Sequence, residues 1–166
     1  IDISIILVPR DIFTYKDIIY IYIIDRDLIG RGEAAPSERY GESSELILSV
    51  LESGIQVPEN YQSREHLWDF LKPQLRKIAS LEAAVNMAVW DLSTQKQNIP
   101  LYISFGFENT TIPKTSYTLS IGKLDELDSK LEESKKCSIL KVKLGTPHDD
   151  REIIKQIRRK TNNLIR

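Results

Sequence analysis

The feature that most constrains the fold is an alternation of strand and helix patterns between residues 116 and 160. Segments 116–121 and 138–144 have strand-like composition, and segments 123–136 and 149–160 have helical apolar periodicity. Strands that alternate with helices at this spacing predict βα units on a parallel sheet. Residues 162–166 then resemble a turn and the start of another strand, so we expect the sheet to continue past Arg166.

The first part of the chain has a different pattern. Segments 3–8, 17–24 and 28–35 are rich in β-branched residues and tyrosine, or contain regularly spaced glycines, and predict three strands. The polar break at 25–27 suits a tight turn, so the second and third strands are predicted to form an antiparallel hairpin.

Three helices are predicted to follow these strands. Ser43 is a candidate N-cap for the first, which ends at Gly54. Ser63 is a candidate cap for the second, and Pro73 lies inside its apolar pattern, which predicts a kink or an irregular end. Ser80 is the predicted cap of the third and longest helix.

Composition excludes several classes of protein. The 166 residues are 41% hydrophobic and 28% charged, which is typical of a folded globular chain. The 23 basic and 24 acidic residues give a net charge of −1, so nothing favours nucleic acid or an anionic membrane as a partner. The single cysteine, Cys137, excludes an internal disulfide framework and predicts a reducing, cytoplasmic location. The sequence leaves a homo-oligomer open.

The pattern that could carry chemistry is Lys141-Val142-Lys143. Residues two apart in a strand share a face, so the two lysines lie together and Leu140, Val142 and Leu144 face the other way. Inside a parallel barrel the lysines would point into the active-site mouth, where a second positive charge favours the neutral amine of a general base. The alternative is a solvated strand surface, because Lys-x-Lys is a common tripeptide. No phosphate-binding loop or nucleophile elbow occurs.

Four segments, taken in order, resemble a known family. They read GRGEAAP at 30–36 followed by YGE at 40–42, AAVNMAVWDL at 83–92 followed by PLY at 100–102, TSYT at 115–118, and LKVKLG at 140–145. This order is similar to the enolase superfamily, specifically the muconate-lactonising subgroup and its dipeptide epimerases. The resemblance covers nearly the whole chain. The family usually has a longer loop at the position of Pro9–Lys16, so the resemblance implies that this loop is either trimmed or lacks a segment.

The resemblance implies a fold and a set of site residues. It implies an α+β capping domain over 1–114, with a three-stranded antiparallel sheet plus helices, followed at 115–166 by the first two βα units of an incomplete (β/α) TIM-type barrel. It implies that Lys143 transfers the proton, that its neighbour Lys141 contacts the substrate, and that Thr118 lies near the substrate carboxylate. It also implies one Mg²⁺ ion held by three barrel carboxylates, which we expect beyond Arg166, so no metal ligand can be named.

Three functions remain open at this stage. The first is a magnesium-dependent epimerase of Ala-Glu-like dipeptides, which would act through α-proton abstraction and an enediolate intermediate. The second is an o-succinylbenzoate synthase or cycloisomerase of the same subgroup, against which the Thr-Ser-Tyr-Thr segment argues. The third is a non-catalytic structural or interaction module, which is favoured if 166 residues are the full chain. Residues 1–166 alone are predicted to be inactive.

Overall fold

The computed structural model describes residues 2–7, 18–107, 111–120, 124–145 and 150–166. The chain divides into two compact units, Ile1–Glu108 and Asn109–Arg166, which are considered separately. The loop at Pro9–Lys16, expected to be trimmed or incomplete, lies outside the described residues.

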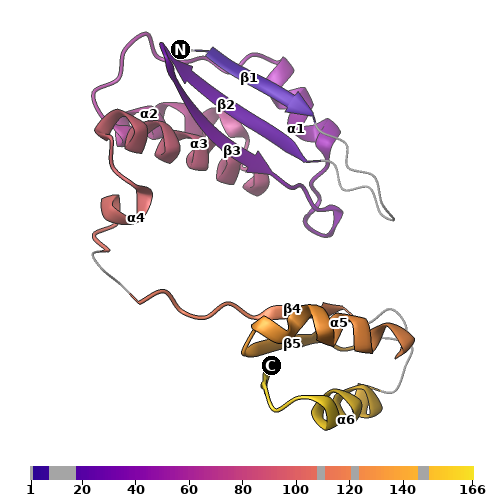
Figure 1. The fold of residues 1–166 in the computed structure, drawn as a ribbon. Coiled ribbons are helices and arrows are strands. Elements are labelled where there is room, and N and C mark those ends of the chain that lie inside the picture. The colour runs from indigo at the N-terminus through magenta and orange to yellow at the C-terminus, as the bar shows by residue number, and fades with distance from the viewer. Residues whose placement is uncertain (1, 8–17, 108–110, 121–123, 146–149) are drawn as a thin grey trace. The chain divides into compact units, whose positions relative to one another are not determined.

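The first unit is built on an antiparallel sheet (Figure 1). Its strands are β1 (Asp2–Leu7), β2 (Ile19–Asp25) and β3 (Leu28–Ala34), in the order β1-β2-β3. β2 and β3 form the predicted hairpin, with Asp25 paired to Leu28 and Arg26 in the left-handed region at φ 56°. The isoleucines at 19, 21 and 23 are fully buried, so one face of β2 belongs to the core.

The helices of the described part of this unit are α1 (Ser44–Glu52), α2 (Arg64–Leu71), α3 (Ala79–Gln97) and α4 (Leu101–Ser104), with short 3₁₀ turns at Glu38–Tyr40 and Lys72–Leu75. Of these, α3 packs along the buried face of the sheet, and α1 and α2 add buried side chains to the same core, whereas α4 contributes none (Figure 1). Two predicted caps are confirmed, because Ser43 Oγ accepts from the Leu46 amide and Ser63 Oγ accepts from the His66 amide. The predicted irregularity at Pro73 is also confirmed, since α2 gives way there to a 3₁₀ turn.

The predicted cap of the third helix is wrong. α3 begins at Ala79, so Ser80 lies within its first turn, and the N-cap residue Ile78 has no capping side chain. The carboxylate of Glu42, from a distant part of the sequence, caps the helix instead. It accepts hydrogen bonds from the amides of Ala79 (2.7 Å) and Ser80 (3.3 Å). A negative charge at a helix N-terminus also interacts favourably with the helix dipole.

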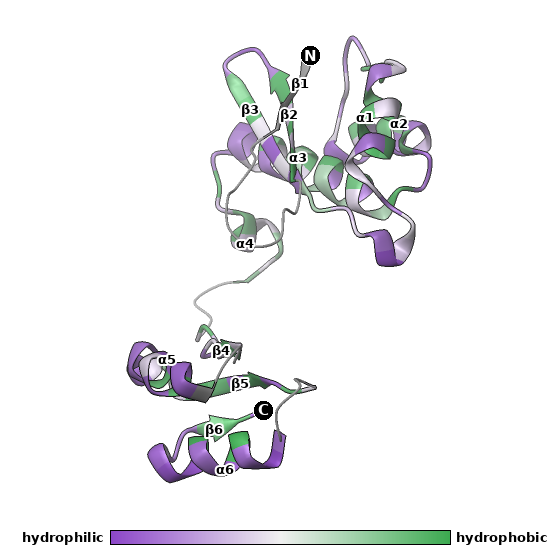
Figure 2. Ribbon diagram, turned by 90° about the vertical axis from the view of Figure 1, so that its right-hand side faces the viewer, coloured by the Kyte–Doolittle hydropathy of each residue, from purple (hydrophilic) through white to green (hydrophobic). Residues whose placement is uncertain are grey.

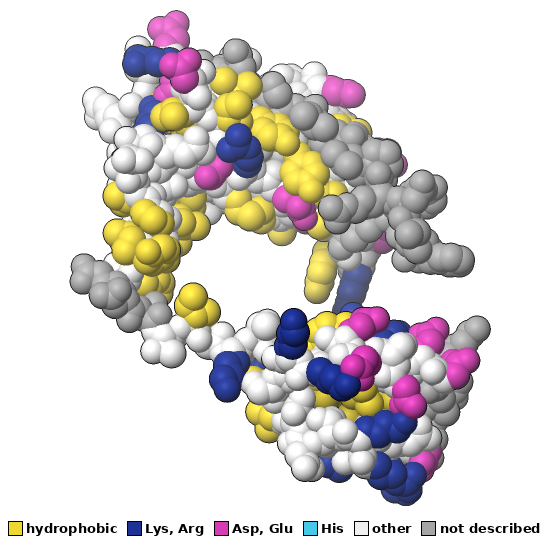
Figure 3. Space-filling model, in the orientation of Figure 1, with side chains coloured by type: hydrophobic (Ala, Val, Ile, Leu, Met, Phe, Trp, Pro, Cys, Tyr) yellow, Lys and Arg dark blue, Asp and Glu magenta, His cyan; other side chains and the backbone are white. Residues whose placement is uncertain are grey.

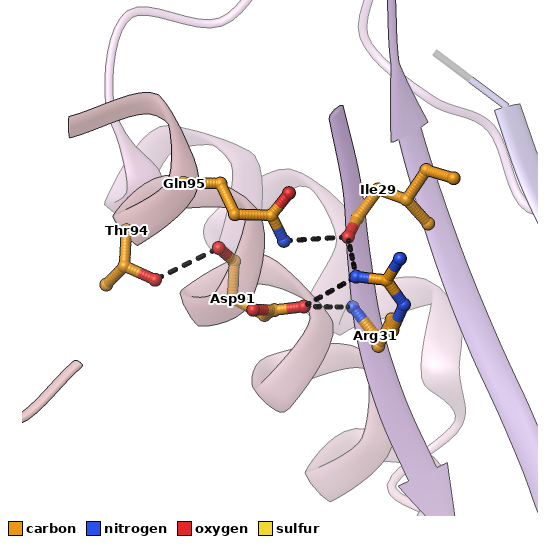
Figure 4. A network of polar contacts seen from close by, with 5 residues as sticks. All are labelled: Ile29, Arg31, Asp91, Thr94 and Gln95. Carbon is orange, nitrogen blue, oxygen red and sulfur yellow. Dashed lines mark hydrogen bonds and ion pairs between the residues drawn. The ribbon is translucent and has the colours of Figure 1, made fainter. Parts of the chain in front are cut away.

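Side chains of α3 bind the backbone of β3 (Figure 4). Asp91 Oδ2 accepts from the Arg31 amide at 2.9 Å, and Gln95 Nε2 donates to the Ile29 carbonyl at 2.8 Å. β3 is at the edge of the three-strand sheet, where backbone groups would otherwise offer a template for another strand. α3 therefore both covers the core and closes part of this edge.

Hydrophobic side chains gather on the surface around α4 (Figure 3). Phe105 packs against Trp90 of α3, with ring centroids 4.5 Å apart. The other large apolar side chains of this segment that are at least one-third exposed are those of Leu101, Tyr102, Ile103 and Phe107.

The second unit contains a parallel sheet in chain order. Its strands are β4 (Tyr117–Ser120), β5 (Ile139–Lys143) and β6 (Leu164–Ile165). Its helices are α5 (Leu127–Glu133), with 3₁₀ turns at Leu124–Glu126 and Ser134–Lys136, and α6 (Asp150–Lys160). The predicted βα alternation is confirmed, although the helix expected over 123–136 is a short α-helix between 3₁₀ turns.

One buried cluster fixes both helices of this unit to the same face of the sheet. Its fully or almost fully buried members are Leu119, Leu127, Leu140, Ile153 and Ile157, which come from β4, α5, β5 and α6. Figure 2 shows the matching pattern on α6, where green hydrophobic positions interrupt a purple polar surface. The opposite face of the sheet receives no helix from the described part of this unit.

Within the described ranges, no helix is both long enough and apolar enough to span a membrane.

Candidate active site

The two predicted lysines lie on the open face of the parallel sheet. Along β5, Leu140 is buried and Val142 is partly buried against the helices, whereas Lys141 and Lys143 are exposed on the other side. The alternation expected for a strand therefore holds, and it separates the apolar residues from the lysines. Lys143 is the last residue of the strand, so the pair lies toward its carboxyl end.

The neighbouring strand places Thr118 beside Lys141. β4 and β5 are parallel, and their register pairs Thr118 with Lys141 and Ser120 with Lys143. Thr118 and Ser120 are both exposed, while Leu119 between them is fully buried. Strand partners in register have side chains close enough to interact. The structure thus brings together the three site residues named from the sequence and adds a second hydroxyl, that of Ser120.

The charge on this face is positive. The described strands and the residues next to them place eight side chains on this face: Ser116, Thr118, Ser120, Ile139, Lys141, Lys143, Leu164 and Arg166. Three of these are basic and none is acidic. A face with hydroxyl and ammonium donors and no carboxylate suits an anionic ligand such as a substrate carboxylate.

Polar contacts on the helix side hold β4 and β5 in place. Tyr117 Oη donates to Glu133 Oε2 at 2.8 Å, and this hydrogen bond, together with desolvation, raises the pKa of the tyrosine. The amide of Gly145, just beyond β5, donates to Asp150 Oδ2 at 3.0 Å at the start of α6. These contacts join each strand to the helix that follows it.

The described residues do not supply the expected metal site. A magnesium ion prefers several oxygen ligands, commonly including carboxylates. In the portion of the chain that the structure describes, no group of three or more His, Cys, Asp or Glu side chains could hold a metal ion. The residues that the structure describes therefore do not fit the ion implied by the resemblance.

Arg166 is a further residue of this face that the sequence analysis did not single out. Its Nη2 donates to Ser116 Oγ at 2.8 Å, although the two residues are 50 positions apart. The only sequence signal was that Arg166 lies two positions after Leu164 in a predicted strand. Since the register of that strand against β5 cannot be deduced from the sequence, its neighbours could not be named.

The comparisons with known proteins agree with the sequence motifs. No family model matches the chain. It is 28% identical over 162 residues to the L-Ala-D/L-amino acid epimerase of Flavobacterium johnsoniae, covering 96% of this chain and 47% of that protein. It is 29% identical over 135 residues to the L-Ala-D/L-Glu epimerase of Bacteroides thetaiotaomicron, covering 80% of this chain and 35% of that protein.

A solved structure shares the fold. The dipeptide epimerase of Cytophaga hutchinsonii, complexed with Mg and the dipeptide D-Ala-L-Val, matches with a TM-score of 0.72 at 24% identity, covering 92% of this chain and 44% of that one. These matches confirm the resemblance to the amino-terminal portion of dipeptide epimerases. The chain spans about half the length, or less, of the curated relatives it matches.

Proposed function

We propose that this chain is the amino-terminal portion of a dipeptide epimerase that inverts a carbon next to a carboxylate by removing and returning its proton. The observation that carries the proposal is the cluster of Lys143, Lys141 and Thr118 on the helix-free face of a parallel sheet. The similarity to dipeptide epimerases over 96% of the chain supports it.

The topology of the second unit supports an incomplete barrel. Right-handed crossovers put successive helices on one face when the strand order follows the chain order, as it does in β4-β5-β6. Continuing this pattern closes a (β/α) barrel with helices outside and the lysine face inside. We propose that 115–166 begins such a barrel and that 1–114, with its antiparallel sheet and helices, is the capping domain.

Each site residue has a proposed role. Lys143 Nζ, as the neutral amine, takes the proton of the α-carbon, and the electron pair of the broken C–H bond moves into the carboxylate to form an enediolate. Lys141 contacts the substrate beside it, and Thr118 donates to the substrate carboxylate. Return of a proton from the opposite side needs a second lysine, which we place, with the three carboxylates that would bind Mg²⁺, outside this sequence. The proposed substrate class is an Ala-Glu-like dipeptide.

The test is hydrogen exchange at the α-carbon. The longer parent protein, supplied with magnesium, is incubated with a panel of dipeptides in D₂O and followed by NMR. We expect exchange and inversion of one residue, and Lys143→Ala should slow both by about 10²- to 10⁴-fold, the contribution typical of a general base. Arg159→Met, on the outer surface of α6, is the matched control and should leave the rate unchanged.

The same assay separates the alternatives. Turnover of lactones or of an o-succinylbenzoate precursor with no exchange of dipeptide protons would favour the second enzyme class. A parent protein that processes neither class would support a non-catalytic module and contradict the proposal.

A further inference from the structure

Arg166 is the third basic residue on the lysine face, and its backbone fixes its place there. The Arg166 amide donates to the Leu140 carbonyl, and the Arg166 carbonyl accepts from the Val142 amide, both at 2.9 Å. These bonds continue the pairing of Ile165 with Leu140, so Arg166 comes next to Lys141 on the adjacent strand.

The Arg166 side chain crosses from one outer strand to the other. Its guanidinium reaches Ser116, which precedes β4 and lies two residues before Thr118. The register pairs Tyr117 with Leu140, which sets Ser116 level with Ile139. The contact therefore passes over β5 at the level of Ile139 and Lys141, on the side of the lysine pair away from the carboxyl end of the strand.

The crossing has two physical consequences for Lys141. The guanidinium, held by Ser116, occupies space toward the amino end of β5, which leaves the lysine side chain room toward the carboxyl end. Lys141 and Arg166 are neighbours on adjacent strands, and their positive charges repel each other, which favours the same direction. Arginine suits this place because its planar fork has several donors and keeps its charge, whereas lysine has a single flexible ammonium.

We infer that Arg166 is a positioning residue, which with Ser116 forms a clamp beneath the lysine pair and directs Lys141, and through it Lys143, toward the substrate. This inference rests on the proposed function, since it assigns a role at the same site. Arg166 itself need not contact the substrate.

The kinetic test uses the longer parent protein and the α-proton exchange assay. Misplacement of a reacting group by about 1 Å can cost about 10²-fold in rate, so Arg166→Met should lower kcat by about 10- to 100-fold while KM changes by less than about 3-fold. Arg166→Lys keeps the charge and an ammonium group that can donate to Ser116, and should recover kcat to within about 5-fold of the wild type. Ser116→Ala should lower kcat by a smaller factor and add little in the double variant with Arg166→Met.

The matched control is Arg158→Met. The guanidinium of Arg158 donates to the carbonyls of Thr161 and Asn163, so it supports the turn into β6 without reaching the lysine face. We expect this variant to keep kcat within about 3-fold of the wild type. If kcat fell equally in Arg158→Met and Arg166→Met, Arg166 would only stabilise the strand, and the inference would be overturned.

A second measurement follows the contact itself. With isotope-labelled arginine, the Arg166 side-chain NMR signal, assigned by its loss in Arg166→Lys, should shift in Ser116→Ala but not in Arg158→Met. If the Arg166 signal did not shift in Ser116→Ala, the contact between Arg166 and Ser116 would be contradicted and the inference overturned. If the parent is active but Arg166→Met keeps its kcat, only this inference fails; if the parent exchanges no dipeptide proton, the proposed function fails and this inference falls with it.

Discussion

At the scale of single residues, two glycines decide how closely sheet and helix approach. A Cβ atom on Gly32 would lie 1.8 Å from the carbonyl oxygen of Ala84, and one on Gly30 would lie 2.1 Å from that of Ala88. Both obstacles are backbone atoms of α3, which cannot move aside as a side-chain end could. The close packing of β3 on α3 therefore depends on glycine at both strand positions and on the small residues Ala84 and Ala88 in the helix.

Gly32→Ala should consequently be severely destabilising. Overpacking typically costs about 1–3 kcal/mol, and a backbone clash this deep should reach about 3 kcal/mol or prevent folding. Glu33→Ala, on the exposed side of the same strand, is the control and should change the free energy of unfolding by less than about 0.5 kcal/mol. Urea unfolding followed by circular dichroism measures both. Similar stabilities for the two variants would contradict the close approach of β3 and α3.

A second residue-scale feature is a charged contact between Asp25, Lys96 and Tyr61. The Lys96 ammonium forms an ion pair with the Asp25 carboxylate and lies 4.1 Å above the Tyr61 ring, and Tyr61 Oη donates to Asp25 at 3.0 Å. The hydrogen bond from Lys96 is the main cause that holds the pKa of Asp25 below its ordinary value of 3.8.

This shift predicts a pH dependence with a definite sign. Because the folded-state pKa of Asp25 is lowered, its contribution to stability is present above about pH 4 and is lost as the pH falls through the folded-state pKa. Asp25→Asn should therefore cost about 1 kcal/mol at neutral pH and progressively less in acid. Urea midpoints across this range, with the exposed Asp27→Asn as control, check the trend. A cost that stays constant into acid would exclude the ionised carboxylate as its source.

At the scale of elements, the start of α3 depends on a residue far away in the sequence. Glu42→Ala removes the acceptor for the amides of Ala79 and Ser80 and should cost about 1 kcal/mol, as loss of an N-cap does. Glu42→Gln keeps an acceptor but loses the charge, and should cost less. Glu38→Ala, in the nearby 3₁₀ turn, is the control. Urea unfolding and amide exchange in the first turn of α3 test this, and equal effects of the three variants would contradict the capping role.

The same element shows what the sequence could and could not predict. Ser43 and Ser63 cap helices that begin immediately after them, so local patterns were sufficient to predict those two starts. The cap of α3 comes from 37 positions away, and no local pattern indicates it, which is why Ser80 was wrongly chosen.

The candidate site could also be predicted only in part. The alternation of residues along β5 was sufficient to place Lys141 and Lys143 on one face. Arg166 and Ser116, however, meet only through the register of three strands.

At the scale of the whole molecule, the two units differ in how completely they bury their cores. The core of the first unit takes buried side chains from the sheet and from three helices, with the aliphatic residues of β2 and α3 at its centre. In the described part of the second unit, the core is a cluster of five buried side chains on one face of its sheet. Its other face exposes Leu164 and the two lysines, and its outer strands have open edges in the described part of this unit.

Buried apolar area stabilises by about 25 cal/mol per Å², so the 109–166 unit should open far more often than the first within the 166-residue chain. Hydrogen exchange with mass spectrometry should show long-lived protection in β2 and α3 and rapid exchange in β4 and β5. The same sample should show no α-proton exchange with dipeptides, because the proposed metal ligands and second lysine are absent from it. Covering the lysine face, as the rest of the proposed barrel would, should slow exchange in β4 and β5 most. If these strands were as protected in the 166 residues as in the parent, the open face would not be the surface that the rest of a barrel covers.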